Sequence, residues 1–260
     1  LFNAAYNYRQ ARAIGPALKM FEAVVAYPDK SSEALRLKKD ASLELPPLYQ
    51  QLGNYAKAAQ GYESYALAHP TEKEVENYHF NAAVIYDGLM YYDNAIKNYE
   101  AYFKKEKRQA ERVESIYYQA EIWKKRGNSA KAIQHYQQYI YSPVNNKDRI
   151  IEAHYKLYQL YLKNGDKLNA NRWRDKTIRA QDEFAKTDKR IGSKYAADAK
   201  FNQVKEIYEE LKAVALPADA RKQKTGIEKR DALTLKLQKE IGQIVVKYTD
   251  GNTIVASWTL

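Results

Sequence analysis

The chain has 260 residues and no cysteine, and its 43 Lys and Arg outnumber its 32 Asp and Glu to give a formal net charge of +11. The lack of cysteine excludes disulfides, thiolate metal sites and cysteine nucleophiles, without fixing a compartment. The basic balance would suit an anionic partner such as nucleic acid, anionic lipid or an acidic protein. It is also an ordinary surface for a lysine-rich helical protein.

No apolar run approaches the roughly 20 residues needed to span a bilayer. The chain opens Leu1-Phe2-Asn3, without a methionine and without a charged leader followed by an apolar stretch. We therefore expect an interior segment of a longer protein, truncated at its C-terminus as well. Missing targeting signals carry no meaning in such a segment.

The first two predicted elements are helix pairs over residues 1–28 and 31–70. Gly15-Pro16 predicts the break of the first pair, and the second pair turns at Leu52-Gly53-Asn54. Pro46 and Pro47 lie inside the first helix of the second pair, where they remove backbone donors and crowd the preceding turn. They predict a kink or a restart of that helix.

Three more pairs are predicted over residues 73–107, 110–143 and 148–185. The last two turn at Arg126-Gly127-Asn128 and Asn164-Gly165-Asp166, where glycine takes the left-handed conformation at low cost. The turn of 73–107, Leu89 to Tyr92, lacks that glycine. Two longer helices follow, over 194–216 and 218–248. Residues 249–260 could form a hairpin around Asp250-Gly251 or begin another helix, and we favour the helix because nothing upstream supplies a sheet.

An internal repeat relates these pairs. Ala58, Ala95 and Ala132 are spaced by 37 residues, and each opens an octet with tyrosines at i+4 and i+7. A weaker copy begins at Ala170. The three positions share one stripe of a helix, and self-similarity at this period is typical of helical-repeat proteins. The sequence therefore predicts an all-α repeat scaffold.

The repeats resemble the tetratricopeptide repeat (TPR), which places a small residue and an aromatic on its first helix, Gly at the turn, and Tyr, Ala, an aromatic and Pro on its second. Repeat two has Tyr49, Gly53, Tyr55, Ala58, Tyr62 and Pro70, and repeat three has Ala83, Tyr86, Tyr92, Ala95 and Tyr99. Repeat four has Ala120, Trp123, Gly127, Ala132 and Tyr136, and repeat five has Tyr161, Gly165 and Ala170 but Arg174 in place of an aromatic.

The resemblance implies a right-handed superhelical solenoid of antiparallel helix pairs, with about five pairs in residues 1–185 and a helical extension over 186–260. The repeats depart from the TPR pattern in their longer period and in Tyr65, Tyr102 and Tyr139, which replace a small residue. These departures are similar to bacterial cell-envelope TPR proteins. Leu216-Pro217, Lys236, the step from Tyr248 to Gly251 and Trp258 are similar to large TPR proteins of adventurous gliding motility.

The same resemblance implies a concave groove lined by the first helix of each pair, in which a partner peptide or helix would lie. Its exposed positions, in register, are Asn77, Phe80, Val84, Asp87, Glu114, Tyr117, Glu121, Lys124, Glu152, Tyr155, Gln159 and Leu162. Phe80, Tyr117 and Tyr155 recur at one slot and predict a ladder of aromatic anchors. The alternative is that these rings pack on neighbouring helices and are half-buried.

Charged groups admit two interpretations. Acidic residues on the predicted groove face would make it mixed or acidic and suited to a basic ligand, or they serve solubility alone. The basic clusters lie in several repeats, at Lys104–Arg108, Lys124–Arg126, Arg172–Arg179, Lys186–Arg190 and Arg221–Lys224. Because a nucleic-acid face would concentrate them on one stripe with stacking aromatics, nucleic-acid binding is the less favoured interpretation.

No catalytic or metal-binding motif accompanies the repeats. His69, His79, His135 and His154 show no metal-ligand spacing, and no phosphate-binding loop or nucleophile elbow is present. We therefore expect a non-enzymatic protein–protein scaffold without a cofactor. The resemblance places it in a bacterial envelope or motility complex, in the periplasm or at the outer membrane. The alternatives are a module that binds nucleic acid or an anionic surface, and the recognition arm of a larger enzyme.

Overall fold

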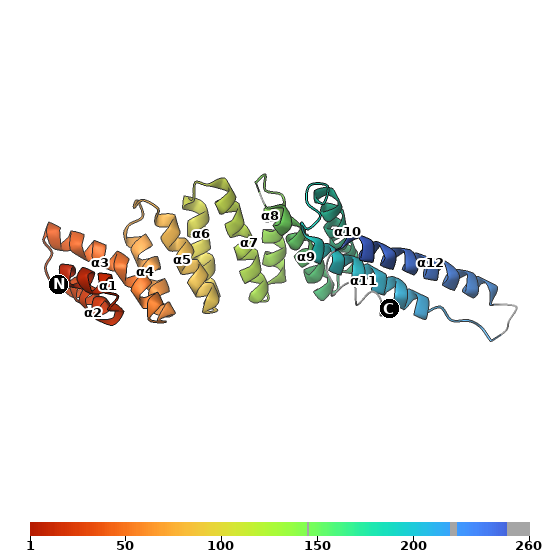
Figure 1. The fold of residues 1–260 in the computed structure, drawn as a ribbon, viewed down its shortest axis with the longest axis horizontal. Coiled ribbons are helices and arrows are strands. Elements are labelled where there is room, and N and C mark those ends of the chain that lie inside the picture. The colour runs from red at the N-terminus through yellow and green to blue at the C-terminus, as the bar shows by residue number, and fades with distance from the viewer. Residues whose placement is uncertain (145, 219–222, 249–260) are drawn as a thin grey trace. The chain divides into compact units, whose positions relative to one another are not determined.

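The computed structural model describes all residues except 145, 219–222 and 249–260, and the described residues form helices only (Figure 1). The first six are α1 (Phe2–Gln10), α2 (Ile14–Ala26), α3 (Ser32–Gln51), α4 (Tyr55–Ala68), α5 (Val75–Gly88) and α6 (Tyr92–Lys105). The next six are α7 (Gln109–Lys125), α8 (Ser129–Ile140), α9 (Lys147–Lys163), α10 (Lys167–Phe184), α11 (Ser193–Lys212) and α12 (Lys224–Lys247).

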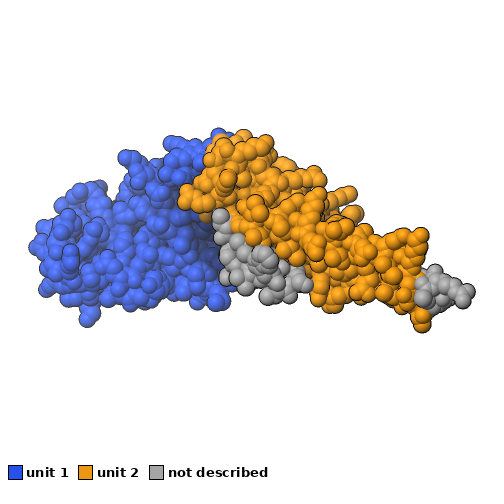
Figure 2. All heavy atoms as spheres, turned by 45° about the vertical axis from the view of Figure 1, so that its right-hand side comes forward, with its two compact units in different colours: residues 1–135 blue, residues 136–260 orange. Residues whose placement is uncertain are grey.

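The helices fall into two compact units, which are coloured separately in Figure 2. Unit 1 is Leu1–His135 and unit 2 is Tyr136–Leu260, so the boundary falls within α8. In unit 1, each helix from α1 to α7 packs against the next one along the chain, and in unit 2 the same holds from α9 to α12. Sequential packing of helix pairs confirms the predicted all-α repeat architecture.

The repeated octets form the interior of these units. Ala58, Ala95, Ala132 and Ala170 are each 0% exposed, so neighbouring helices approach the backbone of α4, α6, α8 and α10 closely at these points. The tyrosines that follow are buried too, namely Tyr62, Tyr65, Tyr99, Tyr102, Tyr136 and Tyr139. The conspicuous aromatic stripe is therefore core, as its place on the second helix of each pair indicates.

The turns within pairs repeat one backbone conformation. Gly53, Gly127 and Gly165 have φ of +75°, +78° and +79°, as the glycine pattern predicts. The glycine-free third turn places Met90 in the same left-handed region, with φ +63°. Asn54, which follows the first of these glycines, caps α4 by accepting a hydrogen bond from the Lys57 amide, as an Asn at a helix N-cap usually does.

The break predicted for the first pair is wrong, and of the kink or restart predicted at Pro46 and Pro47 the restart is absent. The first pair breaks one turn earlier than Gly15-Pro16, at Arg12 with φ +58°, so that Pro16 falls inside the first turn of α2, where proline is tolerated. Helix α3 runs without a restart through Pro46 and Pro47. Neighbouring α4 accommodates the ring of Pro46 with Gly61, where a Cβ atom would lie 2.8 Å from Pro46 Cγ.

Helices α11 and α12 pack together around a separate apolar cluster, whose buried members include Val204, Ile207, Leu233, Leu237 and Ile244. The helices predicted over 194–216 and 218–248 are confirmed as α11 and α12, with α12 beginning at Lys224. The choice between a helix and a hairpin for 249–260 lies outside the described residues. No helix in the described part of the chain is both long enough and apolar enough to span a membrane.

Candidate functional site

The predicted groove positions of the third repeat lie along one side of α5. Asn77, Phe80, Val84 and Asp87 are spaced by three or four residues, which aligns them on a helix. Val84 is 45% exposed, whereas Asn77, Phe80 and Asp87 are half-buried. An exposed apolar side chain with polar neighbours is therefore present on this side of α5.

Phe80 belongs to an aromatic cluster between α5, α6 and α7. Its ring centroid lies 5.2 Å from that of Tyr102, 6.0 Å from that of Tyr99 and 6.2 Å from that of Tyr118. Tyr99 and Tyr118 stack at 5.6 Å. Edge-to-face and offset pairs of this kind add to the stability gained by burial, so Phe80 helps to join its own repeat to the fourth repeat.

The groove positions of the fourth repeat lie on α7, and their ring is buried. Tyr117 is 5% exposed and meets Tyr118 edge-on at 6.4 Å, while Glu114, Glu121 and Lys124 are half-buried. The sequence analysis left two alternatives for Tyr117, an exposed anchor or a ring packed on neighbouring helices. The structure shows the packed ring. A partner on this face of unit 1 would meet Val84 and the polar rim, with the rings beneath as a floor.

The carboxylates of this face are matched by lysines. Lys125 Nζ donates to both carboxylate oxygens of Asp87, at 2.8 and 2.6 Å, and Lys124 Nζ lies 2.7 Å from a Glu121 oxygen. Exposed pairs of this kind contribute little stability. They do cancel much of the negative charge, so the face around α5 and α7 is mixed rather than acidic.

The groove positions of the fifth repeat lie on α9, in unit 2. Tyr155 is 9% exposed and packs on Tyr158 at 5.8 Å and on Tyr195 at 5.7 Å, and its burial raises its pKa to about 12. Glu152 lies 3.7 Å from Lys156. Gln159 and Leu162 are exposed, the latter by 47%. On α9 the polar and aliphatic positions, not the ring, are available to a partner.

Tyrosine–carboxylate hydrogen bonds between neighbouring repeats were not predicted. Tyr49 donates to Glu22 at 2.5 Å and Tyr86 donates to Glu63 at 2.9 Å, each from the first helix of a pair to the second helix of the preceding pair. Burial, and then the hydrogen bond to Glu22, raise the pKa of Tyr49 to about 12. The 37-residue spacing of the two tyrosines was a visible signal, but their partners are not repeated at that spacing.

The connection between α6 and α7 is fixed by Glu106. Its buried carboxylate accepts hydrogen bonds from the Tyr102 hydroxyl at 2.9 Å, from the Arg108 amide at 2.7 Å and from the Arg108 guanidinium. These bonds, led by the one from the guanidinium, lower the pKa of Glu106 to about 2. The basic cluster at Lys104–Arg108 thus contains a structural ion pair at its centre.

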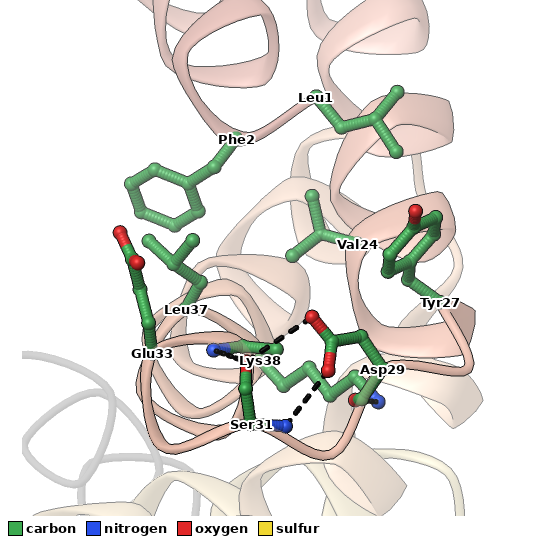
Figure 3. Close-up of a pocket in the computed structure, with 10 residues that line it drawn as sticks. Leu1, Phe2, Val24, Tyr27, Asp29, Ser31, Glu33, Leu37 and Lys38 are labelled. Atoms are coloured by element: carbon green, nitrogen blue, oxygen red, sulfur yellow. Dashed lines mark hydrogen bonds between the residues drawn. The ribbon is translucent and has the colours of Figure 1, made fainter.

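A pocket of about 510 Å³ at the N-terminal end of unit 1 was also missed (Figure 3). Figure 3 shows its apolar wall, made of Leu1, Phe2, Val24, Tyr27 and Leu37, and its polar rim, which includes Asp29, Ser31, Glu33 and Lys38. Asp29 accepts from the Ser31 amide at 2.8 Å, and Lys38 Nζ donates to the Asp29 carbonyl at 2.8 Å. The lining comes from three helices, so no sequence spacing revealed it.

Metal-binding geometry is not found among the described residues, where no three His, Asp or Glu side chains converge.

The chain was compared with known proteins. No model of a protein family matches it, and no curated protein does. Among solved structures, the C-terminal part of a TPR repeat-containing protein from Cytophaga hutchinsonii matches all of this chain and 93% of its own, with 17% identity and a TM-score of 0.50. The fold is a tetratricopeptide-repeat fold.

Two further solved structures are similar at lower TM-scores. A TPR repeats protein from Bacteroides fragilis has a TM-score of 0.48 at 14% identity, with 85% of this chain and 96% of that chain covered. The MamA protein has a TM-score of 0.49 at 15% identity, with 72% and 92% covered. TPR folds generally mediate protein–protein interactions and are usually non-catalytic.

Proposed function

We propose that the protein is a non-catalytic scaffold that binds a partner peptide or helix on the first helices of its repeats. The site in unit 1 consists of Asn77, Phe80, Val84 and Asp87 on α5 with Glu114, Tyr117, Glu121 and Lys124 on α7. A separate part in unit 2 consists of Glu152, Tyr155, Gln159 and Leu162 on α9. In both parts the rings form the floor and the other side chains make the contacts.

The observation that carries the proposal is the exposed Val84, one turn along α5 from Phe80, whose ring packs with its aromatic neighbours. A rigid aromatic floor costs little entropy on binding because it is already ordered, and an apolar centre within a polar rim is the usual anatomy of an interface. The paired charges at Asp87 and Glu121 favour a partner with polar groups of both signs.

The test places a photo-crosslinking amino acid at Val84 in full-length protein. The matched control is the same amino acid at Glu100, which is exposed on α6, the second helix of the same pair. We expect a defined adduct from position 84 alone, lost when Asp87→Lys and Glu121→Lys are added to the protein. Equal adducts from both positions, or an adduct that survives both charge reversals, would contradict the site.

We also propose that the scaffold works in a bacterial cell-envelope or motility assembly, in the periplasm or at the outer membrane. The support is the resemblance of the long repeats and of the C-terminal segment to such proteins. Fractionation of cells that carry the full-length protein tests it. We expect recovery with the periplasm or outer membrane, and recovery in the cytosol alone would overturn this part of the proposal.

A further inference from the structure

A basic pocket lies in unit 2, mostly on the second helices of the repeats. It measures about 370 Å³ and is lined mainly by α10, with Gln137 of α8 and Tyr161 near the end of α9. Its cations are Arg172, Lys176 and Arg179, and its one carboxylate is Asp175. The excess of positive charge sets it apart from the mixed face of α5 and α7.

The three cations stand at successive turns of α10 and are all exposed. Asp175 lies on the same side of α10, three residues after Arg172 and four before Arg179, but the three cations outnumber it. Like charges at this spacing destabilise a helix. In the part of the chain that the structure describes, no carboxylate lies within ion-pair distance of Arg172 or Arg179. Both guanidinium groups are therefore available to a ligand.

The other groups of the pocket are already engaged. Lys176 Nζ lies 4.0 Å from the Trp173 ring centroid and 3.5 Å from the Tyr141 hydroxyl. Asp175 lies 3.6 Å from Nε of the buried Arg174. The lysine and the carboxylate each have a neighbour within the protein, which leaves the two arginines as the recognition groups.

We propose that this pocket binds an acidic peptide segment. Arg172 and Arg179 would each pair with a carboxylate, since the planar guanidinium matches a carboxylate with two parallel hydrogen bonds. The Gln137 carboxamide and the Tyr161 hydroxyl would hydrogen-bond the peptide backbone. The site does not rest on the proposed groove, because its arginines lie on α10, which carries none of the groove positions.

Two observations favour a peptide over nucleic acid. Trp173, the largest ring of the lining, is only 6% exposed and offers no face on which a base could stack, whereas single-strand binding relies on such stacking. Asp175 in the lining repels a continuous phosphate backbone, while a peptide can place a carboxylate at each arginine and a neutral residue between them.

The experiment measures the binding of a labelled peptide of alternating glutamate and glycine to the full chain by fluorescence anisotropy at low and physiological salt. The variant is Arg172→Glu with Arg179→Glu, which leaves Lys176 on Trp173. The matched control is Lys224→Glu with Arg230→Glu, which makes the same change of charge at exposed positions of α12. A labelled single-stranded oligonucleotide of equal length is the competing probe, and circular dichroism confirms that each variant is folded.

We expect the peptide to bind, and the Arg172 and Arg179 variant to weaken it at least about tenfold, because two arginine–carboxylate pairs are replaced by repulsion. The control should change it by less than about twofold, through overall charge alone. Absence of binding, equal losses in both variants, or tighter binding of the oligonucleotide that is lost in the same variant would each overturn the proposal.

Discussion

At the scale of single residues, the turn inside each repeat shows what one backbone angle requires. Glycine supplies the positive φ at Gly53, Gly127 and Gly165, but Met90 supplies it in the third repeat. A side chain in this conformation costs about 1–2 kcal/mol, and Met90 recovers little by packing because it is 71% exposed. Like the turn of the first pair at Arg12, the third turn is therefore a local weakness in the series.

Met90→Gly should stabilise unit 1 by about 0.5–1 kcal/mol, because the relief of the left-handed conformation exceeds the entropy that glycine loses on folding. Urea unfolding followed by circular dichroism measures the change. Met90→Ala is the control, since alanine keeps the unfavourable φ and should gain nothing. An equal gain from both variants would show that the methionine side chain, not the backbone, is the source.

His154 has a buried imidazole, and its protonation makes the stability of unit 2 depend on pH. Burial, with a smaller contribution from the positive charge of Lys176, lowers its pKa from 6.5 to about 4. Above pH 6.5 the ring is neutral in both folded and unfolded chains and has no effect. Between pH 6.5 and 4 the unfolded chain takes up the proton more readily, so stability falls as the pH falls.

His154→Gln should remove this pH dependence. In the wild type it lowers the free energy of unfolding by about 3 kcal/mol between pH 6.5 and 4. The free energy of unfolding, measured by urea titration at a series of pH values, should drop more steeply in the wild type than in the variant over that window. Parallel curves for the two proteins would mean that another group causes the acid sensitivity.

At the scale of helices, α3 and α4 meet at a point where one residue has no side chain. The ring of Pro46 occupies the place where a Cβ on Gly61 would be, at 2.8 Å. A helix normally gains about 1 kcal/mol when an interior glycine becomes alanine, but overpacking costs about 1–3 kcal/mol. The contact with Pro46 therefore decides whether an alanine at position 61 stabilises or destabilises the protein.

Gly61→Ala should destabilise unit 1 by about 1 kcal/mol, the overpacking cost less the gain in helix propensity. In a Pro46→Ala background the same substitution should instead stabilise, because the ring is gone. A double-mutant cycle by urea unfolding measures the coupling between the two positions. Equal effects of Gly61→Ala in both backgrounds would show that the two residues do not meet.

The helices could be predicted well from sequence, and the exposure of the site residues less well. The Ala-x-x-x-Tyr-x-x-Tyr spacing revealed the pairs because a helix face repeats at a fixed period. It could not reveal that Tyr117 and Tyr155 are buried, since burial depends on how closely the next helix packs. The spacing also could not reveal that α3 continues through Pro46, because the residue that makes room for the proline ring, Gly61, lies on α4.

At the scale of the whole chain, each helix packs mainly on its neighbours along the sequence. We therefore expect each repeat to depend for its stability mainly on the adjacent repeats. In such an architecture a substitution changes its own repeat and the adjacent interfaces most. Gly61→Ala should therefore lower hydrogen-exchange protection in α3 and α4 more than in α10 and α11. Mass spectrometry of exchanged peptides checks this, and a uniform loss across the chain would indicate one cooperative unit instead.

Trp123 and Trp173 give each unit its own optical reporter. Trp123 is 8% exposed in unit 1, with Lys131 Nζ 4.0 Å from its ring centroid, and Trp173 is 6% exposed in unit 2, with the His154 ring at 5.4 Å. With Trp258 and one of these two tryptophans replaced by phenylalanine, each single-tryptophan chain would emit from one unit only. Fluorescence could then follow the two units separately in one intact molecule.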